Sequence, residues 1–331
     1  MFDDFAKVWT IVGSARDVRA GKLYSRTVAG ERVVLFRDGE GRPAALIDRC
    51  PHRGVALSLG KLCYGIVECP FHGWRFDATG ANRLVPWNPD AKREVLGATA
   101  LPIREINGLL WLHTGPVATT EPSPGETLLR ADLVCTVQSA LWRTHWTRAM
   151  ENMLDMPHLP FVHRGTIGRE MAQAGSERMD LRWTATESGG LIENVTPERE
   201  RQTRLAFLYP NAMELVIDPP RRTLRIVAVC LPEAANTTRM ILATYRSFAR
   251  SRLLDPIFRF ANRRIAREDQ AILESSDPPE IPRAVEEKSV RTDAPTLAFR
   301  KLYFERLKDS HAGEPTRGDG PPPSAARTPP P

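Results

Sequence analysis

The 331-residue sequence has no apolar run long enough to cross a membrane. A membrane helix needs about 18 or more consecutive apolar residues, and stretches such as residues 226–231 fall far short of that length. The first residues, MFDDFAKVW, are acidic and contain neither a basic segment nor a long apolar segment, so no secretory signal is expected. These absences predict a protein without transmembrane segments that works in a reducing cytoplasm.

The sequence also lacks an even set of cysteines and a dense basic tract. Five cysteines, an odd number in a chain of this length, do not indicate a set of structural disulfides, and they are better candidates for metal ligands. The 46 lysines and arginines are scattered among 40 acidic residues, without interleaved aromatic residues, which argues against nucleic-acid binding. The excess of basic residues remains a candidate binding surface for an acidic protein partner.

What is present indicates two domains, because the chain exceeds what one hydrophobic core usually organises. Short β-branched and aromatic runs between Gly, Asp and Pro turns predict an all-β domain over residues 1–117. A segment rich in Pro, Gly and Thr indicates a linker over residues 118–130. Further strands and one long helix predict an α+β domain over residues 131–310. The Pro-rich end, residues 311–331, is expected to be a disordered tail.

The first domain contains two matched segments, each with one cysteine and one histidine. Cys50 and His52 form a C-x-H pair, sixteen residues follow, and Cys69 and His72 form a C-x2-H pair. Thiolates suit one iron and imidazoles the other, so these four residues are predicted to bind a [2Fe–2S] cluster. The alternative is a structural zinc site, but zinc fingers usually group Cys with Cys and His with His and then continue into a helix.

A second candidate metal site begins with Asp155, His158 and His163 in the segment ENMLDMPHLPFVHRG. Two histidines five residues apart diverge by about 140° on a regular helix. Pro157 and Pro160 are expected to distort the helix enough for the two imidazoles to converge. Two imidazoles and a carboxylate, with other positions left open, are typical of non-haem Fe(II) oxygenases. Taken alone, the same spacing also fits ordinary residues at a helix end.

The carboxylate ligand has to come from elsewhere in the chain. A helix predicted over residues 257–275 carries an apolar stripe at 3,4 spacing, formed by Phe258, Ala261, Ile265 and Ile272. Asp269 falls inside this stripe, where a lone carboxylate needs a partner, so Asp269 is predicted to complete the iron site. Glu268 at the edge of the stripe and Glu274 on the solvated face are weaker candidates. The alternative for Asp269 is a salt bridge to an arginine of the same helix.

Together, the CPHRG, CPFHGW and E-N-x-x-D-x-x-H-x-P-F-x-H segments resemble the Rieske ring-hydroxylating oxygenase family. The last segment looks most like the homotrimeric monooxygenase and demethylase groups and the pheophorbide and chlorophyllide oxygenase branch. The resemblance implies a Rieske domain, then a helix-grip catalytic domain, with a [2Fe–2S] cluster, Fe(2+) and a homotrimer. It also implies that Asp155 hydrogen-bonds His72 of a neighbouring subunit, that Asn152 lies near this route or the iron, and that Glu268–Asp269 matches an acid-Asp pair on the family's late helix.

The resulting hypothesis is the oxygenase component of a Rieske monooxygenase. It would use O2 to hydroxylate, demethylate or oxidatively cyclise an organic substrate, which is expected to be aromatic or polycyclic. The sequence has no G-x-G-x-x-G after a strand and no plant-type ferredoxin cysteine set, so the electrons are expected from a separate ferredoxin or NAD(P)H-dependent reductase. The alternatives are an electron-transfer Rieske protein without oxygenase activity and a zinc-stabilised binding module.

Overall fold

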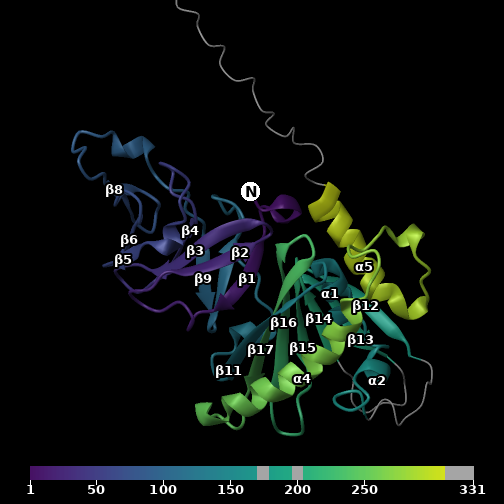
Figure 1. The fold of residues 1–331 in the computed structure, drawn as a ribbon. Coiled ribbons are helices and arrows are strands. Elements are labelled where there is room, and N and C mark those ends of the chain that lie inside the picture. Colours follow the sequence, from purple (N-terminus) through teal and green to yellow (C-terminus); the bar gives the residue numbers. More distant parts are fainter. Residues whose placement is uncertain (170–178, 196–203, 310–331) are drawn as a thin grey trace, which may run out of the picture.

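The computed structural model describes residues 1–169, 179–195 and 204–309 (Figure 1). The first part of the chain forms three small antiparallel sheets, with strand orders β1-β10-β9, β2-β3-β4 and β5-β6-β7-β8. Their strands are β1 (Trp9–Ser14), β2 (Tyr24–Val28), β3 (Glu31–Arg37), β4 (Pro43–Ile47), β5 (Lys61–Cys63), β6 (Ile66–Glu68), β7 (Arg75–Phe76), β8 (Asn82–Leu84), β9 (Ile103–Ile106) and β10 (Leu109–His113). The predicted all-β character of the N-terminal domain is confirmed.

Strand β3 shows how the sequence builds this part. Val33 and Leu35 belong to one hydrophobic core, whereas Val34 and Phe36 belong to a second. Successive side chains of a strand point to opposite faces, so the nearly continuous apolar run ERVVLFR buries both faces of its sheet. The second core contains the buried cysteines of the two cysteine–histidine segments.

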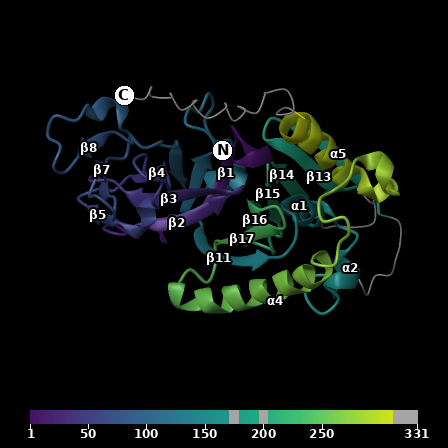
Figure 2. The same ribbon diagram turned by 45° about the horizontal axis from the view of Figure 1, so that its top comes forward.

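The second part is a seven-stranded antiparallel sheet with the order β11-β17-β16-β15-β14-β13-β12. Its strands are β11 (Val134–Trp142), β12 (Leu181–Thr186), β13 (Gly189–Asn194), β14 (Arg204–Leu208), β15 (Ala212–Val216), β16 (Leu224–Ala234) and β17 (Thr237–Arg246). The helices are α1 (Trp146–Leu154), α2 (Leu159–Val162), α4 (Asp255–Leu273) and α5 (Ala294–Tyr303). Figures 1 and 2 show α4 running along the sheet beside β11 and β17, which confirms the predicted α+β architecture.

Short helical turns connect these elements. They are η1 (Asp3–Phe5), η2 (Leu57–Leu59), η3 (Arg93–Val95), η4 (Glu126–Leu129), η5 (Arg252–Leu254), η6 (Ala284–Glu286), η7 (Arg291–Asp293) and the π-helical turn η8 (Phe304–Lys308). Within the described ranges, no helix is both long and apolar enough to cross a membrane.

The long helix α4 begins and ends two residues earlier than predicted. Pro256 occupies its first turn, where its missing N–H costs nothing, and the Asp255 carboxylate accepts hydrogen bonds from Arg246 (2.6 Å) and Thr136 (2.7 Å). These contacts fix the start of α4 against the sheet.

The apolar stripe predicted for α4 was only partly right. Ala261 and Ile272 are exposed, and the buried face instead carries Asn262, Ala266, Asp269 and Leu273. The reason is a polar contact that counting apolar residues overlooks: Asn262 Nδ2 donates to Thr244 Oγ1 of β17 at 2.6 Å. Asp269 lies on this rotated buried face.

The N-terminal residues pack against the second part of the chain rather than against the small sheets alone. Phe2 and Phe5 share a core with residues of the seven-stranded sheet, and the rings of Phe5 and Trp146 meet edge to face at 5.4 Å. Asp4 also pairs with Lys308 at 2.9 Å. Figure 1 shows this N-terminal turn beside the end of α5. The predicted tail, residues 311–331, lies outside the described residues.

Candidate metal centres

The two cysteine–histidine segments form loops with the same backbone hydrogen-bond pattern. In each loop the cysteine N–H donates to the carbonyl five residues later, and a glycine four residues after the cysteine donates back to the cysteine carbonyl. The bonds are Cys50 to Val55 (2.8 Å), Gly54 to Cys50 (2.9 Å), Cys69 to Trp74 (2.8 Å) and Gly73 to Cys69 (3.1 Å). Both glycines have φ near +72°, a conformation that favours glycine. The matched CPHRG and CPFHG segments therefore encode two equivalent ligand loops.

These loops present a buried pair of thiols and an outer pair of imidazoles. Cys50 and Cys69 are both buried, and burial together with the neighbouring Cys69 thiol raises the pKa of Cys50 to about 11. His52 Nδ1 and His72 Nδ1 face each other at 3.1 Å, and the His52 ring stacks flat against Trp74 at 4.7 Å. Two sulfurs on one side and two ring nitrogens on the other fit the donor set of a Rieske [2Fe–2S] cluster.

The second centre lies where α1, α2 and α4 meet. Ligand atoms of His158, His163 and Asp269 all lie within 4.8 Å of one another. His163 Nε2 is 2.9 Å from Asp269 Oδ1, and His158 Nε2 is 3.5 Å from the same oxygen. The chain between the two histidines is not one regular helix: α1 ends at Leu154, and α2 is a single turn with Pro160 near its start. This break brings the two imidazoles together, as a regular helix would not.

The charges of this centre favour a bound cation. Burial alone would lower the pKa of His158, but its contacts with Asp155 and Asp269 outweigh burial and raise it to about 9. Burial alone would raise the pKa of Asp269, but the two imidazoles hold it at about 2. An ionised carboxylate that is buried between two imidazoles fits the two-histidine, one-carboxylate donor set of non-haem iron.

Neighbouring side chains hold the three candidate ligands in place. Asn152 Nδ2 donates to Asp269 Oδ1 at 3.0 Å, and His163 Nδ1 lies 2.8 Å from Glu268 Oε2. The sequence indicates Glu268 as a weaker candidate ligand and as half of the acid-Asp pair, but it does not predict the contact between Glu268 and His163. The available signal was that Glu268 lies next to Asp269 in the sequence. Successive residues of a helix are about 100° apart, so the Glu268 side chain can reach the edge of a site that Asp269 enters.

Asp155 lies beside the second centre and is partly open to solvent. Its Oδ2 is 3.4 Å from His158 Nδ1, and this buried nitrogen has no hydrogen-bond partner of good geometry in the described part of the chain. Within one chain, the cluster loops and the second centre lie far apart. Figures 1 and 2 both place β5 to β8 at one end of the molecule and α2 at the other.

Two further histidines of the described residues, His145 and His113, lie outside both centres. His145 caps the start of α1 by accepting the backbone N–H of Thr147. His113 is buried, and its Nδ1 lies 3.0 Å from the Gly115 carbonyl oxygen. Of the three remaining cysteines, Cys230 is fully buried, whereas Cys63 and Cys135 are half-buried.

Two protein families match the chain. Residues 8–99 match the Rieske [2Fe-2S] domain, and residues 142–309 match the vanillate O-demethylase oxygenase C-terminal domain. The methylxanthine N3-demethylase NdmB of Pseudomonas putida is 27% identical over 310 residues, which cover 84% of this chain and 81% of that protein. The chloroplastic chlorophyllide a oxygenase of Chlamydomonas reinhardtii is 29% identical over 209 residues, 61% of this chain and 28% of that protein.

Several curated relatives are much longer than the matched region. The chain spans 45% of the chlorophyllide a oxygenase of Oryza sativa subsp. japonica and 48% of a putative toluene-4-sulfonate monooxygenase iron-sulfur subunit of Comamonas testosteroni. Among solved structures, Pseudomonas putida CBB5 NdmB superposes with a TM-score of 0.80 at 25% identity, covering 92% of each chain. Dicamba monooxygenase superposes with a TM-score of 0.74 at 18% identity, covering 94% of this chain and 99% of that one, and this likeness concerns the fold alone.

Each matched region carries one of the two ligand sets. The Rieske match contains the two cysteine–histidine loops, and the C-terminal match contains the histidine–aspartate centre. Cofactors of the chain are accordingly a [2Fe–2S] cluster and a mononuclear iron. The chain belongs to the Rieske non-haem iron oxygenase family.

Proposed function

We propose that this chain is the oxygenase component of a Rieske monooxygenase. It would take electrons from a separate ferredoxin or NAD(P)H-dependent reductase and use O2 to hydroxylate, demethylate or oxidatively cyclise an aromatic or polycyclic substrate. The observation that carries this proposal is the convergence of His158, His163 and Asp269 within 4.8 Å. A Rieske protein that only transfers electrons does not require a second complete set of metal ligands.

Each residue of the second centre has a role in this proposal. When bound, the cluster supplies single electrons and the mononuclear iron activates O2. His158, His163 and Asp269 would hold the iron from one side, which leaves the other side open to O2 and substrate. Asn152 orients the Asp269 carboxylate, and Glu268 orients the His163 ring, as hydrogen-bonded partners of metal ligands do.

Asp155 is the candidate link between the two centres. The two centres lie at opposite ends of one chain, so a neighbouring chain is the better source of electrons. The Asp155 side chain is 30% exposed beside His158, and His72 is exposed at the other end of the molecule. A hydrogen bond from His72 of a neighbouring subunit to Asp155 would join cluster and iron. Head-to-tail contacts form a ring when the rotation between subunits closes and an open filament when it does not. We infer the closed form, as a homotrimer in the cytoplasm.

Exposed aromatic side chains at the cluster end support such a contact. Tyr64 and Trp87 are both 98% exposed, and Phe71, which precedes the ligand His72, is 58% exposed. Large apolar side chains of this kind, close to a cluster ligand, are typical of a protein–protein contact surface.

The bridge is tested with Asp155→Asn. Both metals should stay bound and the cluster should stay reducible, but product formation should fall by orders of magnitude, because the amide cannot replace the charge that binds both imidazoles. Rapid mixing with O2 and substrate should show a reduced cluster that fails to reoxidise. Asp132→Asn, which changes an exposed carboxylate paired with Arg130, is the matched control. Normal reoxidation in Asp155→Asn, or a fully active monomer, would remove the bridge.

The oxygenase activity itself is tested with isotopically labelled oxygen. Protein that contains both metals, reduced chemically, is given 18O2 and a panel of O-methylated and N-methylated aromatic compounds, and products are analysed by mass spectrometry. Labelled hydroxylated products or formaldehyde should appear with wild type and not with Asp269→Ala. Equal product from Asp269→Ala would contradict the assigned site. A fully loaded wild type that oxidises no compound, while its cluster reduces an acceptor protein, would favour the electron-transfer alternative.

A further inference from the structure

Four charged side chains link α1 to α5 and to the segment between α4 and α5. Arg300 of α5 binds both carboxylate oxygens of Glu151 on α1, at 2.5 and 3.1 Å. One turn earlier on α1, the Arg148 guanidinium donates to the same carboxylate at 3.2 Å. Both arginines also donate to Glu287, each at 2.6 Å. The four residues form a closed ring of alternating charges, which we call the ion ring (Arg148, Glu151, Glu287 and Arg300).

The ion ring is electrically balanced and largely closed to solvent. Glu151 and Arg300 are buried, and the Arg148 side chain is 11% exposed. Hydrogen bonds from Arg148 and Arg300 lower the pKa of Glu287 to about 2, so this carboxylate stays ionised at neutral pH. A buried ion pair adds little stability compared with apolar side chains of the same volume. What an arginine bound to both oxygens of a carboxylate does provide is a fixed orientation.

Helix α1 carries the ion ring on one face and a partner of the candidate iron ligand on the next. Asn152 directly follows Glu151 and lies about 100° further round the helix. Its Nδ2 donates to Asp269 Oδ1 at 3.0 Å. Figures 1 and 2 both place α1 between α5 and α4, and α1 contacts both helices. Helix α1 therefore connects α5 with the second metal centre.

Apolar packing also joins α1 to α5, but it constrains the rotation of α1 less than the ion ring does. The Trp146 ring meets Phe299 and Tyr303 edge to face, at 6.0 and 5.4 Å. Burial of apolar surface is not directional, unlike a hydrogen bond. Side chains extend about 5–6 Å from a helix axis, so a rotation of α1 by about 20° would move the Asn152 amide by about 2 Å. Such a shift would break its 3.0 Å hydrogen bond to Asp269.

We propose that Glu151 and Arg300 are positioning residues of the iron centre. The ion ring sets the rotation of α1 and thereby holds Asn152 against Asp269. This role rests on the proposed function, in which Asn152 orients the Asp269 carboxylate. Because the ion ring contacts α1 and not the metal position, its loss should change iron binding through Asn152.

The test replaces Glu151 and Arg300 together by methionine, which keeps the net charge and leaves the other two charges of the ion ring paired at 2.6 Å. This methionine pair should unfold at a temperature near that of wild type, because apolar side chains often replace a buried ion pair without loss of stability. Its Fe(II) affinity, measured by anaerobic titration of protein that retains the cluster, should fall by about tenfold. The control pair replaces Glu214 and Arg225, a buried ion pair of β15 and β16, by methionine and should keep wild-type affinity.

A double-mutant cycle with Asn152→Ala distinguishes positioning from a purely structural role. If the ion ring acts through Asn152, the methionine pair combined with Asn152→Ala should bind Fe(II) no more weakly than Asn152→Ala alone. Losses that add, wild-type affinity in the folded methionine pair, or an equal loss in the control pair would overturn the proposal. Arg300→Lys serves if the methionine pair does not fold. It keeps all four charges but loses the two-bond contact, so Fe(II) affinity should still fall, and wild-type affinity in this variant would also overturn the proposal.

The same titrations separate the ion ring from the role proposed for Asn152. Weaker Fe(II) binding in Asn152→Ala, with wild-type affinity in the methionine pair, would remove the ion ring alone. Wild-type affinity in Asn152→Ala would remove the orienting role of Asn152 and the ion ring with it.

Discussion

The contact between Glu268 and His163 gives a prediction about iron affinity. His163 is 1% exposed, and its Nδ1 lies 2.8 Å from Glu268 Oε2, which also accepts a hydrogen bond from Thr166 at 2.7 Å. When Nδ1 carries the proton and donates to Glu268, Nε2 presents its lone pair to the metal position. Glu268→Ala removes the acceptor, frees the ring orientation and leaves a buried N–H without a partner.

The expected loss in Fe(II) affinity follows from this geometry. Removing a hydrogen-bonded partner of a metal-ligating histidine typically weakens metal binding by about 10- to 100-fold. That range corresponds to about 1.4 to 2.8 kcal/mol. Glu268→Gln should lose less affinity than Glu268→Ala, because its amide oxygen can still accept the Nδ1 proton.

The assay is an anaerobic Fe(II) titration of protein from which the mononuclear iron alone has been removed, with the cluster followed by its visible absorption. Glu274→Ala is the matched control, because Glu274 lies on the same helix but pairs with Arg143 and Gln270. An affinity of Glu268→Ala within twofold of wild type, or an equal loss in Glu274→Ala, would refute the proposed orienting role.

Further predictions concern pH, the backbone near the ligands, and assembly. The pKa of His158 in the metal-free protein is raised from its ordinary 6.5 to about 9, so a proton competes with iron below pH 9. Fe(II) affinity should therefore rise between pH 6 and 8.5, and a flat profile would contradict this. Gly168→Ala should lose the mononuclear iron and keep the cluster spectrum, because a Cβ would lie 1.9 Å from the Leu159 carbonyl oxygen between the two histidines; full iron content would contradict it. Phe71→Asp should dissociate the proposed trimer in sedimentation experiments, and an unchanged sedimentation coefficient would remove Phe71 from the proposed contact.

The cluster loops were the easiest part to predict from the sequence. All four candidate ligands and both glycines lie within two segments of five residues each, so short-range backbone hydrogen bonds fix their geometry. The candidate iron site was harder to predict, because its ligands come from two segments about a hundred residues apart. Asp269 was singled out from an apolar stripe, and the structure brings it to both histidines although Ala261 and Ile272 of that stripe are exposed.

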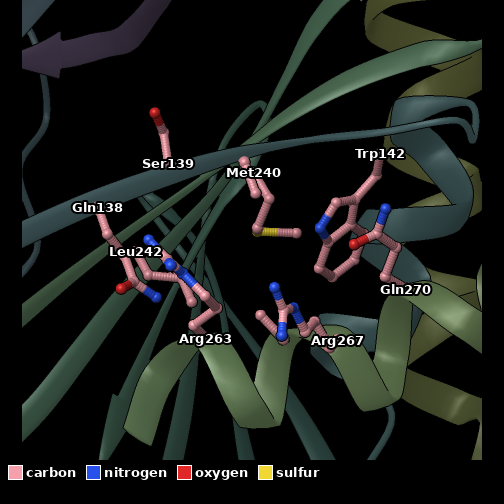
Figure 3. Close-up of a pocket in the computed structure, with 10 residues that line it drawn as sticks. Gln138, Ser139, Trp142, Met240, Leu242, Arg263, Arg267 and Gln270 are labelled. Atoms are coloured by element: carbon pink, nitrogen blue, oxygen red, sulfur yellow. The ribbon is translucent and has the colours of Figure 1, made fainter. Parts of the chain in front are cut away.

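The remaining features depend on contacts between distant segments. The face that α4 buries is set in part by Asn262 and Thr244, a polar pair that apolar periodicity does not report. A cavity of about 210 Å³ between β11 and α4 is lined by residues more than a hundred positions apart in the sequence (Figure 3). Packing of Phe5 on Trp146 likewise joins the N-terminus to the second part of the chain, which no local pattern in MFDDFAKVW indicated.

The central claim is that one chain holds a [2Fe–2S] cluster and a separate mononuclear iron. The most direct test is iron and acid-labile sulfide analysis of wild type and Asp269→Ala. Wild type should contain about three irons and two sulfides per chain. Asp269→Ala should contain about two irons and two sulfides. Its cluster spectrum should be unchanged, because the candidate cluster ligands lie in the N-terminal part of the chain and Asp269 does not. Stoichiometric zinc without sulfide in wild type, or three irons retained in Asp269→Ala, would contradict the account.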